Sequence, residues 1–409
     1  HQPRAPPAAR PLPFAPSPSH ARLPIAACQI LPPEAATAPA RATFDVEAPP
    51  RLVQTLAMTP AQSPRAFLDV EASALGRRWT GPGIEQERLA EAMAQQTRLP
   101  MALCHTLVRR GVPPAEAAAF LAPVLRDLLP DPLSLRDMGA ATDRFVRALK
   151  QRQRIAVFAD YDVDGGASAA LLLIWLRAMG HDATLYIPDR IDEGYGPNVP
   201  AMQALGAVHD LILCVDCGTL SHDPIAAAGC DVVVLDHHLG TETLPAAVAV
   251  VNPNRQDESG DLAHLCAASV VFLMLVETNR RLRATGVQGP DLMALLDLVA
   301  LATVADVAPL IGVNRALVRQ GLRVMARRDR AGLVALADVA RMDQAPTPYS
   351  LGFVLGPRVN AGGRIGQADL GARLLATDDP RAAASMAARL DQLNTERREI
   401  TERVRIEAE

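Results

Sequence analysis

A short apolar run that ends in three closely spaced carboxylates constrains the fold of this chain most. Ile155–Ala159 is too short for a helix and rich in strand-forming side chains, so it predicts a buried strand. Asp160, Asp162 and Asp164 follow at alternate positions, and we expect Gly165 to turn the chain into a helix that begins near residue 167. Open α/β sheets bind ligands at this end of their strands. Three neighbouring carboxylates also repel one another, and a hard divalent cation would relieve the repulsion.

Two other structures share this pattern. One is a solvated acidic turn, which these residues alone favour less than a metal site but do not exclude. An EF-hand calcium loop is the other, but it needs a Glu at its twelfth position and a helix before it. Here Leu171 occupies the twelfth position and a strand precedes the acids, so we set the EF-hand aside.

The composition narrows the class of protein. A net charge of −4 means that a nucleic-acid partner would need a local basic groove. Six cysteines without regular spacing argue against a disulfide scaffold and predict a reducing, cytoplasmic location. No charge-free apolar run approaches the length of a membrane span, so we expect no membrane association.

Four segments differ in composition and period. Residues 1–63 are rich in Pro, Ala and Arg, which predicts a disordered or non-native segment, with Met58 as a plausible true initiator. Residues 64–151 have helical spacing and predict a helical cap, with one helix expected over 114–128. Residues 152–340 predict a metal-binding α/β domain. Residues 341–409 predict a Gly-rich loop and a connector helix, about 380–407, towards a missing second domain.

Strands and helices alternate in the third segment. The expected strands are 155–159, 183–187, 211–215, 232–235 and 247–251, with helices between the first four. Such alternation is typical of a parallel sheet covered by helices on both faces. The predicted fold class is therefore α/β: a parallel five-stranded sheet flanked by helices, with an N-terminal helical cap and a C-terminal connector helix.

Further polar side chains follow the ends of the third and fourth expected strands. Asp216 follows the third strand, and Asp236, His237 and His238 follow the fourth. A polar residue after a single strand is common where a strand ends in a turn. Parallel strands bring these ends to one edge of the sheet, however, so the residues together favour a metal site. Asp306 is a lone acid in an apolar stretch, where either a metal or a capping role would explain it.

Mixed carboxylate and imidazole ligands suit Mn2+ or Mg2+ better than Zn2+, and the number of acids predicts two ions. Two more stretches look suited to substrate. Arg190 lies among glycines after the second strand and could bind phosphate. Gly356–Arg364 is Gly-rich with two arginines, and the alternative for it is a flexible turn with solvated arginines.

At this point the residues resemble a known family. The stretches 160–168, 216–218 and 236–238 together with Asp306 are similar to the four motifs of the DHH phosphoesterases. Within that superfamily, the stretches 192–196, 251–254, 298–309 and 356–364 look like those of the RecJ single-strand-specific exonucleases. The resemblance covers about residue 67 to the end.

The resemblance implies a two-metal 5′-to-3′ exonuclease on single-stranded DNA in recombination and repair, with a single-strand-binding protein and a repair helicase as partners. It implies metal ligands at Asp162, Asp164, Asp216, His237 and Asp306, with Asp216 bridging two ions. It also implies supporting or phosphate-contacting roles for Asp160, Asp236 and His238. The substrate-binding residues that it implies are Ser168, Arg190, Arg358, Asn360 and Arg364.

Three departures from the family pattern concern fine positioning. Ala167 replaces a hydroxyl residue, Cys217 replaces an asparagine, and Cys266–Ser269 replaces a Gly-rich turn. Two other functions remain open beside the exonuclease. One is a different enzyme of the superfamily, namely an oligonucleotide or cyclic-dinucleotide phosphodiesterase or a pyrophosphatase. The other is a non-catalytic replication scaffold, which retention of all the acids disfavours.

Overall fold

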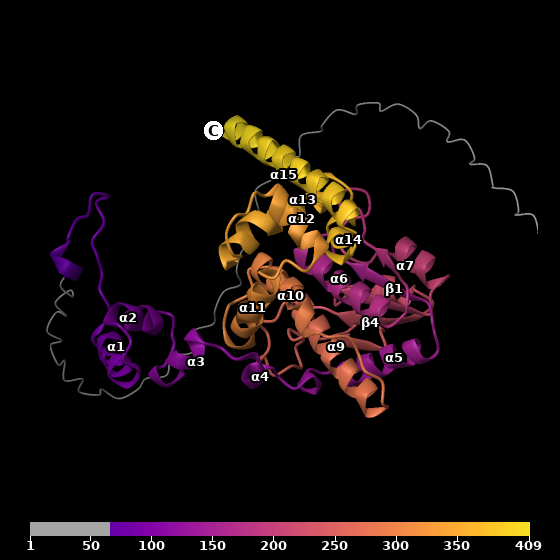
Figure 1. Cartoon of the computed structure of the whole chain (residues 1–409), viewed down its shortest axis with the longest axis horizontal. Coiled ribbons are helices and arrows are strands. Elements are labelled where there is room, and N and C mark those ends of the chain that lie inside the picture. The colour runs from indigo at the N-terminus through magenta and orange to yellow at the C-terminus, as the bar shows by residue number, and fades with distance from the viewer. Residues whose placement is uncertain (1–65) are drawn as a thin grey trace, which may run out of the picture.

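A parallel five-stranded sheet forms the centre of the protein. The computed structural model describes residues 66–409, so the predictions for 1–63 and for Met58 lie outside the described residues. The strands are β1 (Ile155–Ala159), β2 (Ala183–Tyr186), β3 (Leu211–Val215), β4 (Asp231–Leu235) and β5 (Ala249–Val251). All four pairings are parallel and the strand order is β2-β1-β3-β4-β5. The predicted fold class is confirmed (Figure 1).

The strands are apolar because helices cover both faces of the sheet. Val157 and Leu213 point into the larger core, which includes side chains of α6 (Val163–Ala178) and α9 (Ala267–Ala284). Their neighbours along the strands, such as Phe158, point to the opposite face, where α7 (Val199–Gly206) and α8 (His222–Ala226) supply the core. Period-two alternation between two buried faces explains why these strands read as continuous hydrophobic runs.

The order of the strands locates the ligand-binding edge. After β1 the chain forms β2 on one side of β1, and it then forms β3, β4 and β5 on the other side. Open α/β sheets have their binding crevice outside the strand ends at such a switch point. Asp160 follows β1 and Asp216 follows β3, so the candidate acids flank the switch point.

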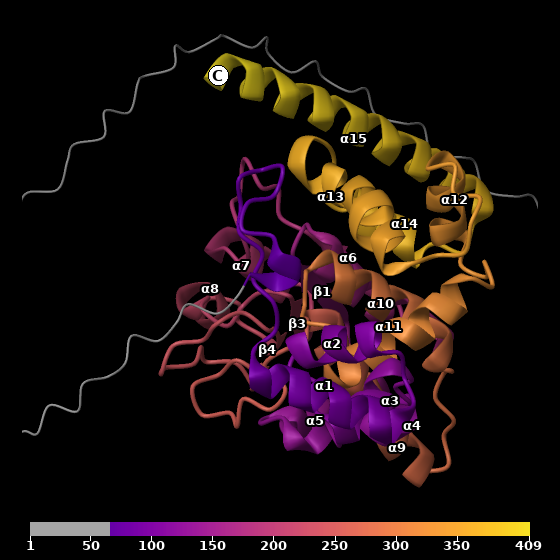
Figure 2. The same cartoon turned by 90° about the vertical axis from the view of Figure 1, so that its left-hand side faces the viewer.

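Further helices enlarge the core on the α6 side of the sheet. One continuous apolar cluster runs from Leu135 to Leu393. The helices that contribute to it, besides α6 and α9, are α5 (Met138–Lys150), α10 (Leu296–Ala305), α11 (Gly312–Met325), α12 (Ala331–Val339), α13 (Gly356–Ile365), α14 (Leu370–Ala376) and α15 (Pro380–Ala408). The last turns of α15 extend beyond the rest of the protein (Figure 2).

A smaller helical unit lies beside this body (Figure 1). It contains α1 (Ile84–Thr97), α2 (Met101–Arg109) and α3 (Ala117–Leu121), and it has an apolar core of its own. The single helix expected over 114–128 is wrong: a short helical turn, α3 and α4 (Leu125–Leu128) occupy it. Pro123 lies between α3 and α4, where proline lacks the amide that a continuing helix requires.

The prediction of a Gly-rich loop at 356–364 is also wrong, because these residues form helix α13. Its glycines provide close packing instead of flexibility. A Cβ atom at Gly356 would lie 3.2 Å from the Cβ of Ala305, and one at Gly363 would lie 2.6 Å from the carbonyl oxygen of Tyr161. Glycine therefore allows α13 to approach α10 and the loop after β1.

Candidate metal centre

The loop after β1 turns directly into α6. Asp162 caps this helix, because its Oδ1 accepts hydrogen bonds from the amides of Asp164 at 2.8 Å and Gly165 at 3.0 Å. The helix therefore begins at Val163, earlier than expected, and Gly165 belongs to its first turn. A Cβ at Gly165 would lie 2.4 Å from the carbonyl oxygen of Asp160, so glycine is required here for close approach and not for a turn.

Asp164 joins this loop to a distant helix. Its two carboxylate oxygens accept hydrogen bonds from the first amides of α9, Oδ2 from Ala267 at 2.7 Å and Oδ1 from Ala268 at 2.8 Å. A helix N-terminus stabilises negative charge through its free amides and its dipole. The side chain of Asp164 is fully buried, so these contacts fix its orientation at the edge of the sheet.

The loop after β4 supplies two imidazoles that Asp236 holds in place. The buried Asp236 carboxylate accepts hydrogen bonds from the amides of Thr219, His237 and His238, and it lies 2.8 Å from Nδ1 of His238. Burial alone would raise the pKa of Asp236, but its bonds to His238 and Thr219 lower that pKa to about 2. The geometry thus gives Asp236 a supporting position behind the histidines.

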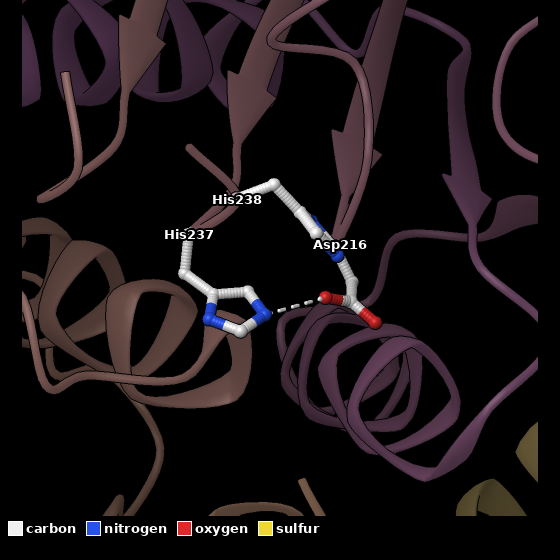
Figure 3. Close-up of side chains that lie close together, drawn as sticks. All are labelled: Asp216, His237 and His238. Atoms are coloured by element: carbon white, nitrogen blue, oxygen red, sulfur yellow. Dashed lines mark ion pairs between the residues drawn. The ribbon is translucent and has the colours of Figure 1, made fainter. Parts of the chain in front are cut away.

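The candidate ligands converge at the switch point. Nε2 of His237 lies 3.3 Å from Oδ1 of Asp216, 3.7 Å from Oδ2 of Asp164 and 3.8 Å from Oδ2 of Asp306. Figure 3 shows His237 directed at Asp216, with His238 beside them. Three groups of side chains could each hold an ion: Asp216, His237 and His238; Asp164, His237 and Asp306; and Asp160, Asp162 and Asp216. Asp216 and His237 each belong to two of these groups.

The electrostatics of the cluster favour cations. Burial and the nearby Asp162 raise the pKa of Asp160 to about 7 and that of Asp306 to about 6. Burial and neighbouring carboxylates also raise the pKa values of Asp164 and Asp216. Among the described residues, Oδ1 of Asp160 and Oδ1 of Asp216 are buried without a hydrogen-bond partner. Orphaned carboxylate oxygens beside an imidazole are a donor set that fits Mn2+ or Mg2+.

The predicted substrate-binding residues do not all reach this cluster. The Oδ1 of Asn360 accepts a hydrogen bond from the amide of Val163 at 3.0 Å, so it lies against the loop after β1. The guanidinium of Arg190 lies 5.2 Å from the centre of the Tyr161 ring on the same loop. Ser168 is buried inside α6. Arg358 is engaged by another residue, because its Nε binds Asp391 of α15 at 2.8 Å, while Arg364 is exposed near the end of α13.

The structure adds residues that the sequence analysis did not assign to the site. The hydroxyl of Tyr195 donates to the carbonyl oxygen of Asp216 at 3.2 Å and contacts the ring of His238. Asn252 donates to the carbonyl oxygen of His238, and Asn254 donates to that of His237. The Asn-Pro-Asn stretch directly after β5 is the sequence pattern that could have indicated the role of the two asparagines.

Known proteins resemble this chain in sequence. The family described as "DHH family, N-terminal domain" matches residues 154–303. The single-stranded-DNA-specific exonuclease RecJ of Dickeya dadantii is 41% identical over 324 residues, which are 76% of this chain and 55% of that protein. RecJ of Escherichia coli K12 is 37% identical over 340 residues, or 80% of this chain and 58% of that protein. The chain thus spans about half the length of these curated relatives.

Solved structures of RecJ proteins resemble this chain in sequence and fold. A crystal structure of exonuclease RecJ bound to manganese is 36% identical, with a TM-score of 0.61, over 68% of this chain and 69% of that chain. A structure of RecJ from Thermus thermophilus with Mn2+ is 32% identical, with a TM-score of 0.65, over 79% of this chain and 46% of that one. The sequence identity and the shared fold show that this chain belongs to the RecJ family of DHH proteins.

Proposed function

We propose that this chain carries the catalytic metal centre of a single-strand-specific DNA exonuclease that hydrolyses phosphodiester bonds. The observation that carries the proposal is the convergence of three candidate ligand groups that share Asp216 and His237. Candidate groups that share side chains would suit two neighbouring ions, and a pair of ions is the donor-activating arrangement used for displacement at phosphorus. The relatives named above as single-stranded-DNA-specific exonucleases support DNA as the substrate.

The chain's own residues have distinct parts in this mechanism. Asp162, Asp164, Asp216, His237 and Asp306 would hold two Mn2+ or Mg2+ ions. Bound ions would polarise the scissile phosphate and lower the pKa of the attacking water. Asp236 orients His238, whose side chain is 44% exposed and is therefore accessible to a phosphate oxygen. Asp160 would act as a supporting acid beside Asp162.

The direction of digestion and the biological setting rest on the resemblance. We infer 5′-to-3′ polarity and a role in recombination and repair, with a single-strand-binding protein and a repair helicase as partners. Residues 66–409 include no helix with the length and apolarity of a membrane span. The five cysteines within the described part are unpaired, which supports the proposed cytoplasmic location.

The test is a Mn2+-dependent digestion series. Single strands of two to 60 nucleotides, the matching duplex, a cyclic dinucleotide and pyrophosphate are incubated with the purified protein, and each end of the strands is labelled in turn. We expect release of 5′ mononucleotides from long single strands and little digestion of the duplex. Activity confined to two- to five-mers, the cyclic dinucleotide or pyrophosphate would favour another enzyme of the superfamily.

Two variants make the test specific to the metal centre. Asp216→Ala should abolish digestion with unchanged circular dichroism, whereas Asp343→Ala removes an exposed carboxylate outside the candidate groups and should leave the rate unchanged. Absence of both Mn2+ uptake and digestion in the unsubstituted protein would instead support the non-catalytic scaffold.

A further inference from the structure

Helices α13 and α15 approach each other closely beside the loop after β1. A Cβ atom at Gly362 would lie 3.0 Å from Cδ2 of Leu390, and one at Gly366 would lie 2.5 Å from Cδ1 of Leu393. Arg364 lies between these glycines on α13, and Arg397 lies one helical turn after Leu393 on α15. The packing therefore brings Arg364 and Arg397 to the same end of the contact between the two helices.

Within the described residues, the guanidinium of Arg397 forms no ion pair with an acidic side chain. Its Nη2 donates to the Oδ1 of Asn394 at 3.1 Å, while its Nε is buried and has no hydrogen-bond partner within residues 66–409. Burial lowers the pKa of Arg397, and the positive charges of Arg364 and Arg398 lower it further. Positive charges held together without a counter-charge are costly, so this group is suited to an anion.

Two acids near Arg397 on α15 have other partners. Asp391 binds Arg358 at 2.8 Å. Glu396 lies 3.7 Å from Arg389 and accepts a hydrogen bond from Gln392. No ion pair or hydrogen bond of the Arg364 side chain exists within the described part of the chain, where this side chain is exposed. The two arginines therefore remain available to a ligand.

This pair of arginines adjoins the metal centre. Gly363, next to Arg364, packs against Tyr161, and a Cβ there would lie 2.6 Å from the Tyr161 carbonyl oxygen. Tyr161 stands between Asp160 and Asp162 in the loop after β1. A strand whose scissile phosphate lies at the metal centre would thus place a neighbouring phosphate within reach of α13 and α15.

We propose that Arg397 joins Arg364 to form a subsite for a backbone phosphate of single-stranded DNA next to the scissile phosphate. The proposal rests on the function proposed above and extends it to a residue of α15. Guanidinium groups suit this role because their fixed fork of donors binds phosphate oxygens in pairs. The subsite also provides, locally, the positive charge that a chain with a net charge of −4 lacks overall.

The test measures binding without chemistry. Fluorescein-labelled oligothymidylate of six nucleotides is titrated into the metal-free protein in EDTA, and anisotropy gives the Kd at several salt concentrations. Arg397→Gln should weaken binding about 10- to 100-fold, the effect of removing one charge-assisted hydrogen bond to phosphate. It should also reduce the slope of log K against log salt by about 0.7 for each phosphate of the single strand that the variant no longer neutralises.

The matched control is Arg403→Gln, which removes an equal charge from an exposed position on the same helix. It should leave the Kd within about twofold. Arg397→Gln should also keep or raise the melting temperature without DNA, because it removes a buried unpaired donor and a repulsive charge. An arginine needed for the fold would instead lower the melting temperature, and that result would overturn the proposal.

Two further results test whether α15 contacts the strand and whether the subsite is independent of catalysis. Equal Kd values and salt slopes for Arg397→Gln and Arg403→Gln would show that α15 does not contact the strand. In EDTA, Arg397→Gln should weaken binding by the same factor in the Asp216→Ala background as in the unsubstituted protein, although Asp216→Ala digests nothing. Normal Arg397-dependent binding without any Mn2+-dependent digestion would overturn the proposed function and leave the phosphate subsite standing.

Discussion

The close approach of α13 to the loop after β1 makes a specific prediction for Gly363→Ala. The added Cβ would lie 2.6 Å from the carbonyl oxygen of Tyr161 and 2.8 Å from its Cβ. Both atoms lie far inside ordinary contact distance, and a backbone carbonyl cannot rotate away as a long side chain can. Either α13 or the loop that holds Asp160 and Asp162 must therefore move.

The magnitude follows from two opposing effects. Alanine is favoured over glycine in a helix by about 0.5–1 kcal/mol, whereas forcing a methyl group into a packed contact costs about 1–3 kcal/mol. The difference leads us to expect that Gly363→Ala lowers the free energy of unfolding by up to about 2.5 kcal/mol. It should also weaken Mn2+ binding, because the shifted loop carries the candidate ligand Asp162 and the supporting acid Asp160.

Gly139→Ala in α5 is the matched control. A Cβ there would meet its nearest atoms at 3.8 and 3.9 Å, which is ordinary contact, so only the helical preference remains. This variant should gain up to about 1 kcal/mol and bind Mn2+ normally. Urea unfolding and isothermal titration with Mn2+ measure both quantities. If Gly363→Ala is as stable as Gly139→Ala and binds Mn2+ equally well, the close-packing argument for α13 is incorrect.

Three further predictions concern other contacts of the described structure. Asp216→Asn should raise the melting temperature of the metal-free protein, because it removes one of several repelling carboxylates. It should also reduce the rise in melting temperature that Mn2+ causes. Differential scanning fluorimetry measures both effects, and an undiminished Mn2+ effect would exclude Asp216 as a ligand. Asn360→Ala leaves the amide of Val163 without its acceptor and should destabilise the protein by about 1–3 kcal/mol in urea unfolding, so an unchanged midpoint would contradict that contact. Arg330 binds the buried carboxylate of Asp297 through two nitrogens at 2.8 and 2.9 Å, so Arg330→Met leaves that carboxylate without its partner. The variant should lose about 3–5 kcal/mol of the free energy of unfolding, whereas the double variant with Asp297→Leu should recover much of this loss.

The sequence predicted the sheet well because each strand is a local apolar run. The bounds of β1 and β3 agree with the prediction to the residue, since a charged or polar side chain adjoins each run at both ends. The convergence of Asp216 and His237 was also predictable, because parallel strands bring their ends to one edge of the sheet.

Two features were not predictable from local patterns. Glycines at 356, 362 and 363 suggested a loop, but their small size allows a helix to pack closely, at Gly363 against a backbone that lies about 200 residues away in the chain. The hydrogen bond from the amide of Val163 to Asn360 and that from the amide of Ala267 to Asp164 likewise depend on tertiary contacts, so no local sequence pattern predicts them.

The contact between Asp164 and the start of α9 also determines when the site can exist. The two amides that orient Asp164 belong to residues 103 and 104 positions later, and Asp306 follows later still. A nascent chain that has passed only the first strand therefore carries the acidic sequence without the geometry of the site. Ion capture should consequently develop late in synthesis, with the completed tertiary structure, so Mn2+ uptake can serve as a reporter of correct folding in preparations of this protein.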